Sequence, residues 1–369
     1  LDPHSAYLTP KKFQDIQKQA HGEYGGIGLE VTAQEGLLKV VSAIDDTPAQ
    51  KAGLQGDDVI LSINGESLTG LTIYEMSEKL RGDPGSTIML IIRRGTLPPF
   101  EVKVTRERIK VIPIKWRVED NMGYIRITTF NEHTTHTLRK AIAEIQDQLD
   151  VKLLGFGIDV RNDPGGLLDE GISATDLFLE RGEIVSIRGR DPKKNVSFKA
   201  QGKDLVKGLP LVVLINGGSA SASEIFAGAL QDHRRAVIVG TKSFGKGSVQ
   251  TVIPMTNGGA IKLTTARYYT PSGRTIQKSG IEPDIKVEQH VDLKSVDEEK
   301  RLREGDLKKA ISAQSETLEK PCVSDKIKAT SSKLSLLKDV DDFQLQQAFT
   351  ILKTLTLQKL VAIKKIKDL

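Results

Sequence analysis

Two short segments carry the side chains whose types and spacing are best suited to chemistry. The run Phe244–Gln250 holds Lys246 between two glycines, and the earlier run Ser219–Glu224 is rich in serine and alanine. Glycine neighbours give a lysine no side-chain cover and leave the backbone free for close approach. A serine beside a lysine is a recurrent way to build an acyl-transfer site without histidine. The two segments therefore predict hydrolysis through a serine nucleophile.

Ser221 also has a purely structural interpretation. The pattern Ser221-x-x-Glu224 is a capping box, which places Ser221 at the N-cap of the helix that follows. Ser219 and Ser223 compete with it for any reactive role. The structural and reactive interpretations are compatible, because unpaired N–H groups at a helix N-terminus stabilise negative charge on a developing oxyanion.

Lys246 has a rival interpretation as part of a phosphate-binding loop. The run Gly240–Lys246 follows a predicted strand and matches most of a P-loop. The next position should be serine or threonine to hold magnesium, but it is Gly247. A helix should then follow, whereas Ser248–Pro254 alternates like a strand and ends in proline. Both failures fall at positions that the mechanism needs, so nucleotide binding is disfavoured.

An extended segment after Lys246 would place Lys246, Ser248 and Gln250 on one face. Gln250 could then hold the Lys246 amine by a hydrogen bond. A lysine works as a general base only when it is neutral, so its pKa must fall well below its usual value of roughly 10.4. Burial has this effect because it disfavours the charged form.

Two further glycine-rich turns could bind a carbonyl or carboxylate oxygen. Arg161–Gly166 directly follows the predicted strand Leu153–Val160, and its Gly165 and Gly166 can direct N–H groups at a reacting carbonyl oxygen. The alternative is a tight turn and nothing more. Tyr24–Leu29 can form a nest for a terminal carboxylate with a peptide added as a strand, or simply let a strand start sharply.

Histidine catalysis is not favoured. His133 and His136 lie at the start of a predicted helix, and His233 ends another, where a cation suits the helix dipole. The sequence has no Gly-x-Ser-x-Gly motif.

Composition excludes several classes of protein. The chain has 369 residues, 38% apolar and 27% charged, which is typical of a globular protein of two or three domains. Its net charge of +5 comes from interspersed residues, so no nucleic-acid partner is expected. A single cysteine, Cys322, excludes an internal disulfide and a multi-cysteine zinc site, and no metal or other cofactor is expected. No apolar run is long enough for a membrane span. The abrupt start at Leu1 suggests a trimmed fragment.

The pattern of elements predicts four parts. Residues 1–21 form an N-terminal helical segment, with a helix over 5–21. Residues 22–108 are β-rich, with short helices at Pro48–Ala52 and Ile73–Arg81 and strands at Ile27–Thr32, Leu37–Ala43, Val59–Ile63, Thr87–Arg93 and Phe100–Thr105. Residues 109–290 alternate strands with helices, which implies an α/β core with parallel pairing. Residues 291–369 are a charged helical segment, with helices at Ala310–Ser315 and Phe343–Lys365 and a linker at 325–334.

Taken together, these segments resemble a known family. The chain is similar to the carboxyl-terminal processing (tail-specific) proteases, serine peptidases with a Ser/Lys dyad and an embedded PDZ domain. The runs that carry the resemblance extend almost from end to end: Leu1–Leu8, Tyr24–Val31, Thr47–Asp57, Ile63–Gly65, Asp159–Leu168, Ile215–Asp232 and Phe244–Gln250.

The resemblance implies a multidomain α/β fold, in which an α+β PDZ domain is inserted before a crotonase-like α/β protease core. It implies Ser221 as nucleophile, Lys246 as general base and Gln250 as the residue that orients the lysine. The oxyanion hole would use the backbone N–H of Ala222 and of Gly165 or Gly166. The PDZ loop would grip the C-terminus of a substrate, and Arg81 would report that binding to the protease body; the loop residues are Gly26, Ile27, Gly28 and Leu29.

The resemblance also bears on partners and location. It implies protein or peptide substrates bound by their C-terminus, and it allows a homo-oligomer and an adaptor protein. It implies an exported protein, periplasmic or membrane-associated on the extracytoplasmic side. Asp163 departs from the family, in which asparagine is frequent at this position. The competing class is an inactive PDZ adaptor, which would keep the peptide loop but lack Ser221 or Lys246.

Overall fold

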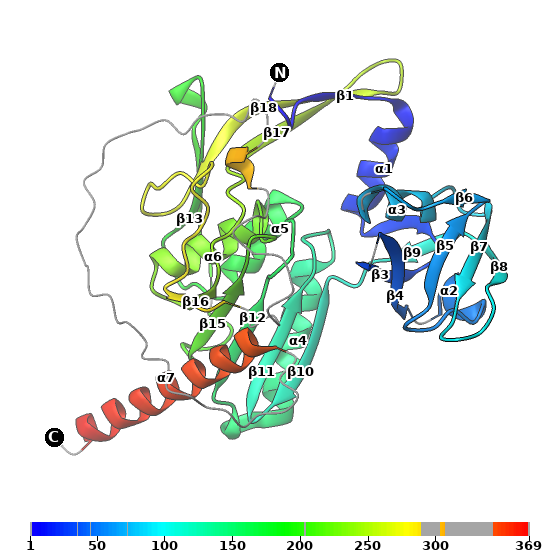
Figure 1. Cartoon of the computed structure of the whole chain (residues 1–369). Helices are drawn as coiled ribbons and strands as arrows, with labels where there is room; N and C mark the ends of the chain where they lie inside the picture. Colours follow the sequence, from blue (N-terminus) through cyan, green and yellow to red (C-terminus); the bar gives the residue numbers. More distant parts are fainter. Residues whose placement is uncertain are drawn as a thin grey trace. The chain divides into compact units, whose positions relative to one another are not determined.

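The computed structural model describes residues 2–34, 36–44, 46–71, 73–202, 204–288, 303–306 and 342–367. Cys322, the predicted helix Ala310–Ser315 and the linker 325–334 lie outside these residues. The chain forms two compact units, Gln14–Ile112 and the combination of Leu1–Phe13 with Pro113–Leu369. Figure 1 labels the elements of each.

The smaller unit is a twisted antiparallel sheet with short helices. Its strands run in the order β3-β4-β5-β7-β8, with β6 paired to β5, and β2 pairs with β9 in a separate two-stranded ladder. The elements are β2 (Glu23–Gly26), β3 (Leu29–Gln34), β4 (Leu37–Ala43), α2 (Pro48–Lys51), β5 (Val59–Ile63), β6 (Glu66–Ser67), α3 (Ile73–Leu80), β7 (Thr87–Arg93), β8 (Phe100–Thr105) and β9 (Glu107–Lys110). Alternate residues of β7, such as Leu90 and Ile92, fill one buried core together with Ile60 and Ile63 of β5, whose pairing register shifts between these two residues.

The larger unit is built on a six-stranded sheet of order β10-β11-β12-β15-β16-β19. Only the β10–β11 pair is antiparallel, and the other neighbours are parallel. The strands are β10 (Ile114–Glu119), β11 (Met122–Ile127), β12 (Gly155–Asp159), β15 (Leu211–Ile215), β16 (Val237–Gly240) and β19 (Ile285–Lys286).

Helices cover both faces of this sheet (Figure 1). The helices α4 (Thr134–Leu149), α5 (Leu168–Asp176) and α6 (Ala222–Asp232) share one core with Val213 and Ile215. The helix α7 (Phe343–Lys367) packs on the other face against Val212 and Leu214. Because successive residues of a strand point to opposite faces, β15 must be apolar throughout, as parallel strands buried on both faces are.

A second, antiparallel sheet borders this core; the sequence indicated its strand Ser248–Pro254 but not how the strands of this sheet pair. Its order is β1-β18-β13-β14, with β17 paired to β18. The strands are β1 (Ala6–Leu8), β13 (Glu183–Gly189), β14 (Val196–Lys199), β17 (Ser248–Pro254) and β18 (Ala260–Tyr269). Short 3-10 helices are η1 (Asp150–Lys152), η2 (Pro192–Lys194) and η4 (Glu304–Asp306).

The expected helix over residues 5–21 is therefore too long at its start. Residues Ala6–Leu8 pair with β18, and the helix α1 spans Pro10–Ala20. Pairing with a distant strand is invisible to local periodicity, while a proline at the first helical position is a common start signal.

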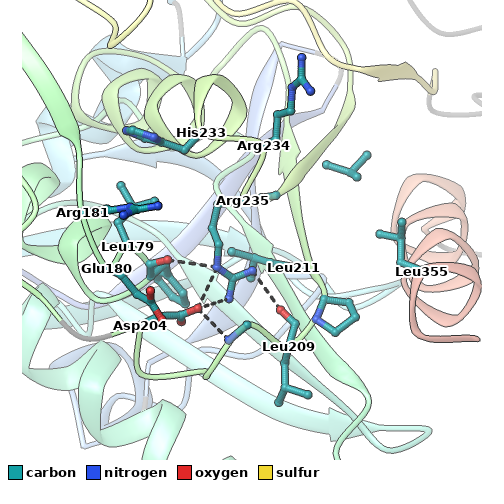
Figure 2. A pocket seen from close by; sticks show the side chains of 15 residues that line it. Leu179, Glu180, Arg181, Asp204, Leu209, Leu211, His233, Arg234, Arg235 and Leu355 are labelled. Atoms are coloured by element: carbon teal, nitrogen blue, oxygen red, sulfur yellow. Dashed lines mark hydrogen bonds and ion pairs between the residues drawn. The ribbon is translucent and has the colours of Figure 1, made fainter. Parts of the chain in front are cut away.

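A cavity of about 550 Å³ lies at the amino-terminal ends of β15 and β16 (Figure 2). Arg235 forms part of its wall: its Nε donates to Asp204 Oδ2 at 3.0 Å and its Nη1 to the carbonyl of Leu209 at 3.0 Å. The predicted catalytic residues follow the carboxyl ends of the same strands, so this cavity is separate from the candidate site.

Candidate active site

Three loops that follow neighbouring parallel strands build the candidate site. The turn 161–166 follows β12, Ser221 follows β15 just before α6, and Lys246 lies between β16 and β17. The carboxyl ends of parallel strands meet at one edge of a sheet, which is where open α/β sheets bind ligands. The topology thus brings the predicted segments to one place.

Ser221 lies at the N-cap of α6 in a strained backbone conformation, with φ 57° and ψ −113°. A residue other than glycine in this region costs about 1–3 kcal/mol and is concentrated at functional sites. Its side chain is nearly buried and lies close to the phenol of Tyr268. Burial raises the pKa of Tyr268 to about 12, which keeps the phenol neutral.

Ser219 and Ser223 are committed to other contacts. Ser219 Oγ donates to the carbonyl of Val160 at 2.8 Å, and Ser223 Oγ donates to the carbonyl of Asp163 at 2.9 Å. Both side chains are fully buried. These two serines tie the turn after β12 to the start of α6, which separates them from Ser221 in role.

The carboxylate of Glu224 joins the two key segments. Its Oε2 accepts the backbone N–H of Ser221 at 2.9 Å and that of Lys246 at 2.9 Å. Its Oε1 accepts the N–H of Gly245 at 2.7 Å and the hydroxyl of Ser243 at 2.5 Å. Because both nitrogens bind the same oxygen at 2.9 Å, the start of α6 and the Lys246 loop are held close together. Burial raises the pKa of Glu224 to about 7, and the four donors oppose this rise.

The environment of Lys246 lowers the pKa of its amine. Burial is the main cause that lowers its pKa, and the positive charge of Lys262 lowers it further. The charges of Glu304 and Glu224 act in the opposite direction. A Cβ on Gly247 would lie 2.4 Å from the backbone nitrogen of Gln277, so only glycine permits this close approach.

The predicted contact between Gln250 and Lys246 is not formed in this structure. Gln250 Nε2 donates to Ser248 Oγ at 2.9 Å and to Thr264 Oγ1 at 3.3 Å. The strand β17 begins only at Ser248, and its register with β18 shifts between Val249 and Gln250, so simple period-two alternation from Lys246 fails. Within the described residues, no hydrogen bond joins the Lys246 amine to Ser221 or to Gln250 either.

The turn after β12 lies against the start of α6. A Cβ on Gly165 would be 2.8 Å from the nitrogen of Ala222, and one on Gly166 would be 2.1 Å from the carbonyl oxygen of Phe130. The N–H of Gly165 donates to Asp163 Oδ1 at 2.8 Å, so it is not directed at a substrate. In the described part of the chain, the N–H groups of Gly166 and Ala222 have no hydrogen-bond acceptor.

A buried network that sequence reasoning missed supports the Lys246 loop. The N–H of Gly247 donates to Gln277 Oε1 at 2.9 Å, and Gln277 Nε2 donates to Glu304 Oε1 at 2.9 Å. Glu304 is fully buried and pairs with His4 Nε2 at 2.8 Å. The four residues come from distant parts of the sequence, and no local motif could have grouped them.

The predicted carboxylate loop lines a cavity of about 170 Å³ in the smaller unit, together with Tyr24, Ser77, Leu80 and Arg81. Gly28 has φ +79°, and a Cβ there would lie 2.4 Å from the Thr47 side chain. Arg81 stacks over the Tyr24 ring, 5.2 Å from its centroid, and pairs with Glu78 at 3.2 Å.

In the residues that the structure describes, no group of three or more His, Cys, Asp or Glu side chains is arranged to hold a metal ion. The same residues include no helix that is long and apolar enough to cross a membrane.

Comparison with known proteins identifies the family. Residues 121–287 match the peptidase family S41 and residues 39–94 match a PDZ domain. A carboxy-terminal-processing protease of Bartonella bacilliformis is 48% identical over 96% of this chain and 80% of its own length. The carboxy-terminal processing protease CtpA of Bacillus subtilis is 33% identical over 83% of this chain and 65% of its own length. The chain belongs to peptidase family S41.

The solved structures agree with this assignment. A photosystem II D1 C-terminal processing protease is 32% identical, with a TM-score of 0.52 over 78% of each chain. The expected fold class, a PDZ domain before an α/β peptidase core, is thereby confirmed. The protein is a serine-type peptidase of the C-terminal processing class.

Replacing Glu224 by glutamine tests the importance of the shared carboxylate. The amide nitrogen of the introduced glutamine side chain cannot accept a hydrogen bond, so two of the four donors lose their acceptor, at roughly 1–3 kcal/mol each. We expect Glu224→Gln to lower the melting temperature and to reduce peptide hydrolysis at least tenfold. The exposed Glu180→Gln is the matched control, and unchanged hydrolysis in Glu224→Gln would contradict this role.

Proposed function

We propose that this peptidase is an endopeptidase that cleaves through a Ser221/Lys246 dyad and recruits substrates by their C-terminus through its PDZ domain. One observation carries the catalytic part: the backbone N–H groups of Ser221 and Lys246 share Glu224 Oε2 as acceptor. The inactive-adaptor alternative is disfavoured, since the chain retains both residues and the fold brings their segments together.

In the proposed first step, Ser221 Oγ attacks the scissile carbonyl carbon and its proton passes to the neutral amine of Lys246. The ammonium then donates that proton to the leaving amine, and an acyl-enzyme remains on Ser221. A water molecule attacks the ester with Lys246 again as base, which releases the second product. The lowered pKa of Lys246 supports this role, because it increases the neutral fraction.

The proposed mechanism requires a small rearrangement at the dyad. Within the described residues no hydrogen bond joins the Ser221 hydroxyl to the Lys246 amine, so the lysine has to turn towards Ser221. Catalytic hydrogen bonds in a free enzyme are frequently long and tighten only when substrate binds. Gln250 could help to orient Lys246 if its side chain rotates away from Ser248. Its Oε1 would then accept a hydrogen bond from the ammonium form of Lys246, while its Nε2 keeps the bond to Thr264.

The proposed oxyanion hole consists of the N–H groups of Ala222 and Gly166. The first lies at the start of α6, where the helix dipole favours negative charge, and the second lies in the turn packed against it. Between the two glycines of the sequence hypothesis, Gly166 is favoured because the N–H of Gly165 is used by Asp163.

Substrate tails are proposed to bind at Gly26–Leu29. The positive φ of Gly28 suits a backbone nest for a carboxylate, and Arg81 lines the same cavity. A bound tail would alter the contacts of Arg81 with Tyr24 and Glu78, which makes Arg81 a candidate for signalling occupancy to the protease body. By family resemblance we further propose an extracytoplasmic location, with self-association or an adaptor protein as regulators.

The dyad is tested by Ser221→Ala and Lys246→Arg. Arginine keeps the positive charge but cannot be deprotonated, so it cannot serve as a base. Each change should reduce the turnover number roughly a thousandfold or more, and the double variant should be little worse. Mass spectrometry of a peptide with an apolar C-terminus measures this, with the exposed Ser279→Ala as control. Cleavage by Ser221→Ala at a rate near wild type would overturn the assignment.

The pH dependence gives a separate test of Lys246. A lowered pKa predicts that kcat/KM rises with pH as the amine loses its proton. Removing the positive charge of Lys262 makes the ammonium form more favourable, so Lys262→Gln should move this acid limb to higher pH. The exposed Lys193→Gln should leave it in place. An acid limb that is the same in all three proteins would argue against Lys246 as the titrating base.

The tail-binding proposal predicts a strong dependence on the substrate's terminal carboxylate. Amidation removes a charge and its hydrogen bonds, so affinity should fall roughly tenfold to a hundredfold. Gly28→Ala should have a similar effect because its Cβ would clash with Thr47, whereas Gly65→Ala, with φ +80° but open space around it, is the control. Titration of fluorescent peptides onto the Ser221→Ala protein measures both, and equal affinity for amidated peptide would exclude this site.

A further inference from the structure

Asp163 has an unusual environment that the mechanism above does not use. It lies in the turn after β12 and is completely buried. Its Oδ1 accepts the N–H of Gly165 at 2.8 Å, while its buried Oδ2 has no hydrogen-bond partner in the described part of the chain. A carboxylate with an unpaired buried oxygen is costly in its charged form, which favours the neutral acid.

The charges around Asp163 do not relieve this cost. The positive charge of Arg126, on β11, acts on Asp163, but the Arg126 guanidinium already binds Asp159 Oδ1 at 2.7 Å. Asp159 of β12, which also binds Arg161, acts on Asp163 as a like charge. Burial, the largest cause, raises the pKa of Asp163 to about 7, and the Gly165 N–H and the charge of Arg126 oppose this rise.

The residue is also attached directly to the proposed oxyanion site. Its backbone carbonyl accepts the N–H of Ala220 at 3.0 Å and the hydroxyl of Ser223 at 2.9 Å, the neighbours of Ser221 and Ala222. Its side chain holds Gly165, whose α-carbon lies against Ala222. A negative charge on Asp163 would therefore act at short range on any oxyanion formed at Ser221, with little solvent screening.

We propose that Asp163 is a positioning residue that sets the upper pH limit of hydrolysis. In its neutral form the side chain orients the turn without opposing the oxyanion. When the carboxyl loses its proton, the unpaired negative charge beside the turn weakens oxyanion stabilisation. Since catalysis also needs neutral Lys246, activity is expected to rise and then fall with increasing pH. This inference rests on the proposed function, namely Ser221 as nucleophile and the oxyanion at Ala222 and Gly166.

The same ionisation affects stability in a defined direction. The pKa of Asp163 is raised by folding, so the folded chain binds this proton more tightly than the unfolded chain. Its contribution to stability is present at low pH and is lost as pH rises from the unfolded value of about 4 to the folded value of about 7. The change Asp163→Asn removes the titration and keeps an oxygen that can accept from Gly165. The melting temperature of Asp163→Asn should therefore increase relative to wild type between pH 5 and pH 8.

The deciding experiment compares kcat/KM for a peptide with a free C-terminus across pH 5.5–9.5. Wild type should show an alkaline limb, with a fall of up to about tenfold per pH unit for a single ionisation. Asp163→Asn should lack that limb and keep the acid limb. Asp147→Asn, an exposed carboxylate on α4, is the matched control. An unchanged alkaline limb in Asp163→Asn would overturn the proposal, whether or not the dependence of melting temperature on pH changes.

A second variant guards against poor folding of Asp163→Asn. The positive charge of Arg126 lowers the pKa of Asp163, so Arg126→Gln should move the alkaline limb to higher pH without removing it. A limb that stays in place or moves to lower pH in Arg126→Gln would contradict the role of Asp163. The Ser221→Ala protein separates the two proposals. If Ser221→Ala still cleaves, the dyad is wrong. If Ser221→Ala does not cleave but the alkaline limb is unaltered in Asp163→Asn, only the pH role of Asp163 is refuted.

Discussion

The site depends on the contacts of one buried carboxylate, that of Glu224. The start of α6 and the loop after β16 follow different strands, and the covalent chain does not fix their separation. Glu224 Oε2 fixes it by accepting the N–H groups of Ser221 and Lys246 at 2.9 Å each. Because the carboxylate is fully buried, water does not compete for these donors, and each hydrogen bond is stronger than it would be at the surface. The group that caps the helix thereby also sets the geometry of the proposed dyad.

Such close packing requires unusual backbone at several points. Ser221 adopts a positive φ that costs about 1–3 kcal/mol, and the turn beside it can approach only because Gly165 and Gly166 lack side chains. Gly247 similarly allows the Lys246 loop to lie against Gln277. The hydrogen bonds of Ser219 and Ser223 to the turn offset part of this strain.

The sequence predicted most of the local structure and the residues of the site, but not their long-range partners. Strands such as Leu37–Ala43 and Thr87–Arg93 were located correctly because their apolar pattern is local. Glu224 was recognised only as half of a capping box, since its bonds to the Lys246 loop depend on the tertiary fold. The expected contact of Gln250 with Lys246 is not formed in this structure, and the register shift in β17 cannot be read from alternation. The contact of His4 with Glu304 has no local signal of any kind.

The two carboxylates near Lys246 share one feature: each accepts hydrogen bonds from other groups. Glu224 and Glu304 both lie close enough to favour the ammonium form, which would prevent Lys246 from acting as a base. Each of them is instead satisfied by other donors: Glu224 by three backbone N–H groups and a hydroxyl, and Glu304 by His4 and Gln277. A direct ion pair would hold the lysine charged, because an opposite charge in contact raises a lysine pKa. Donors from the backbone and from distant side chains occupy these carboxylates. The amine of Lys246 is therefore left unpaired within the described residues, and burial lowers its pKa.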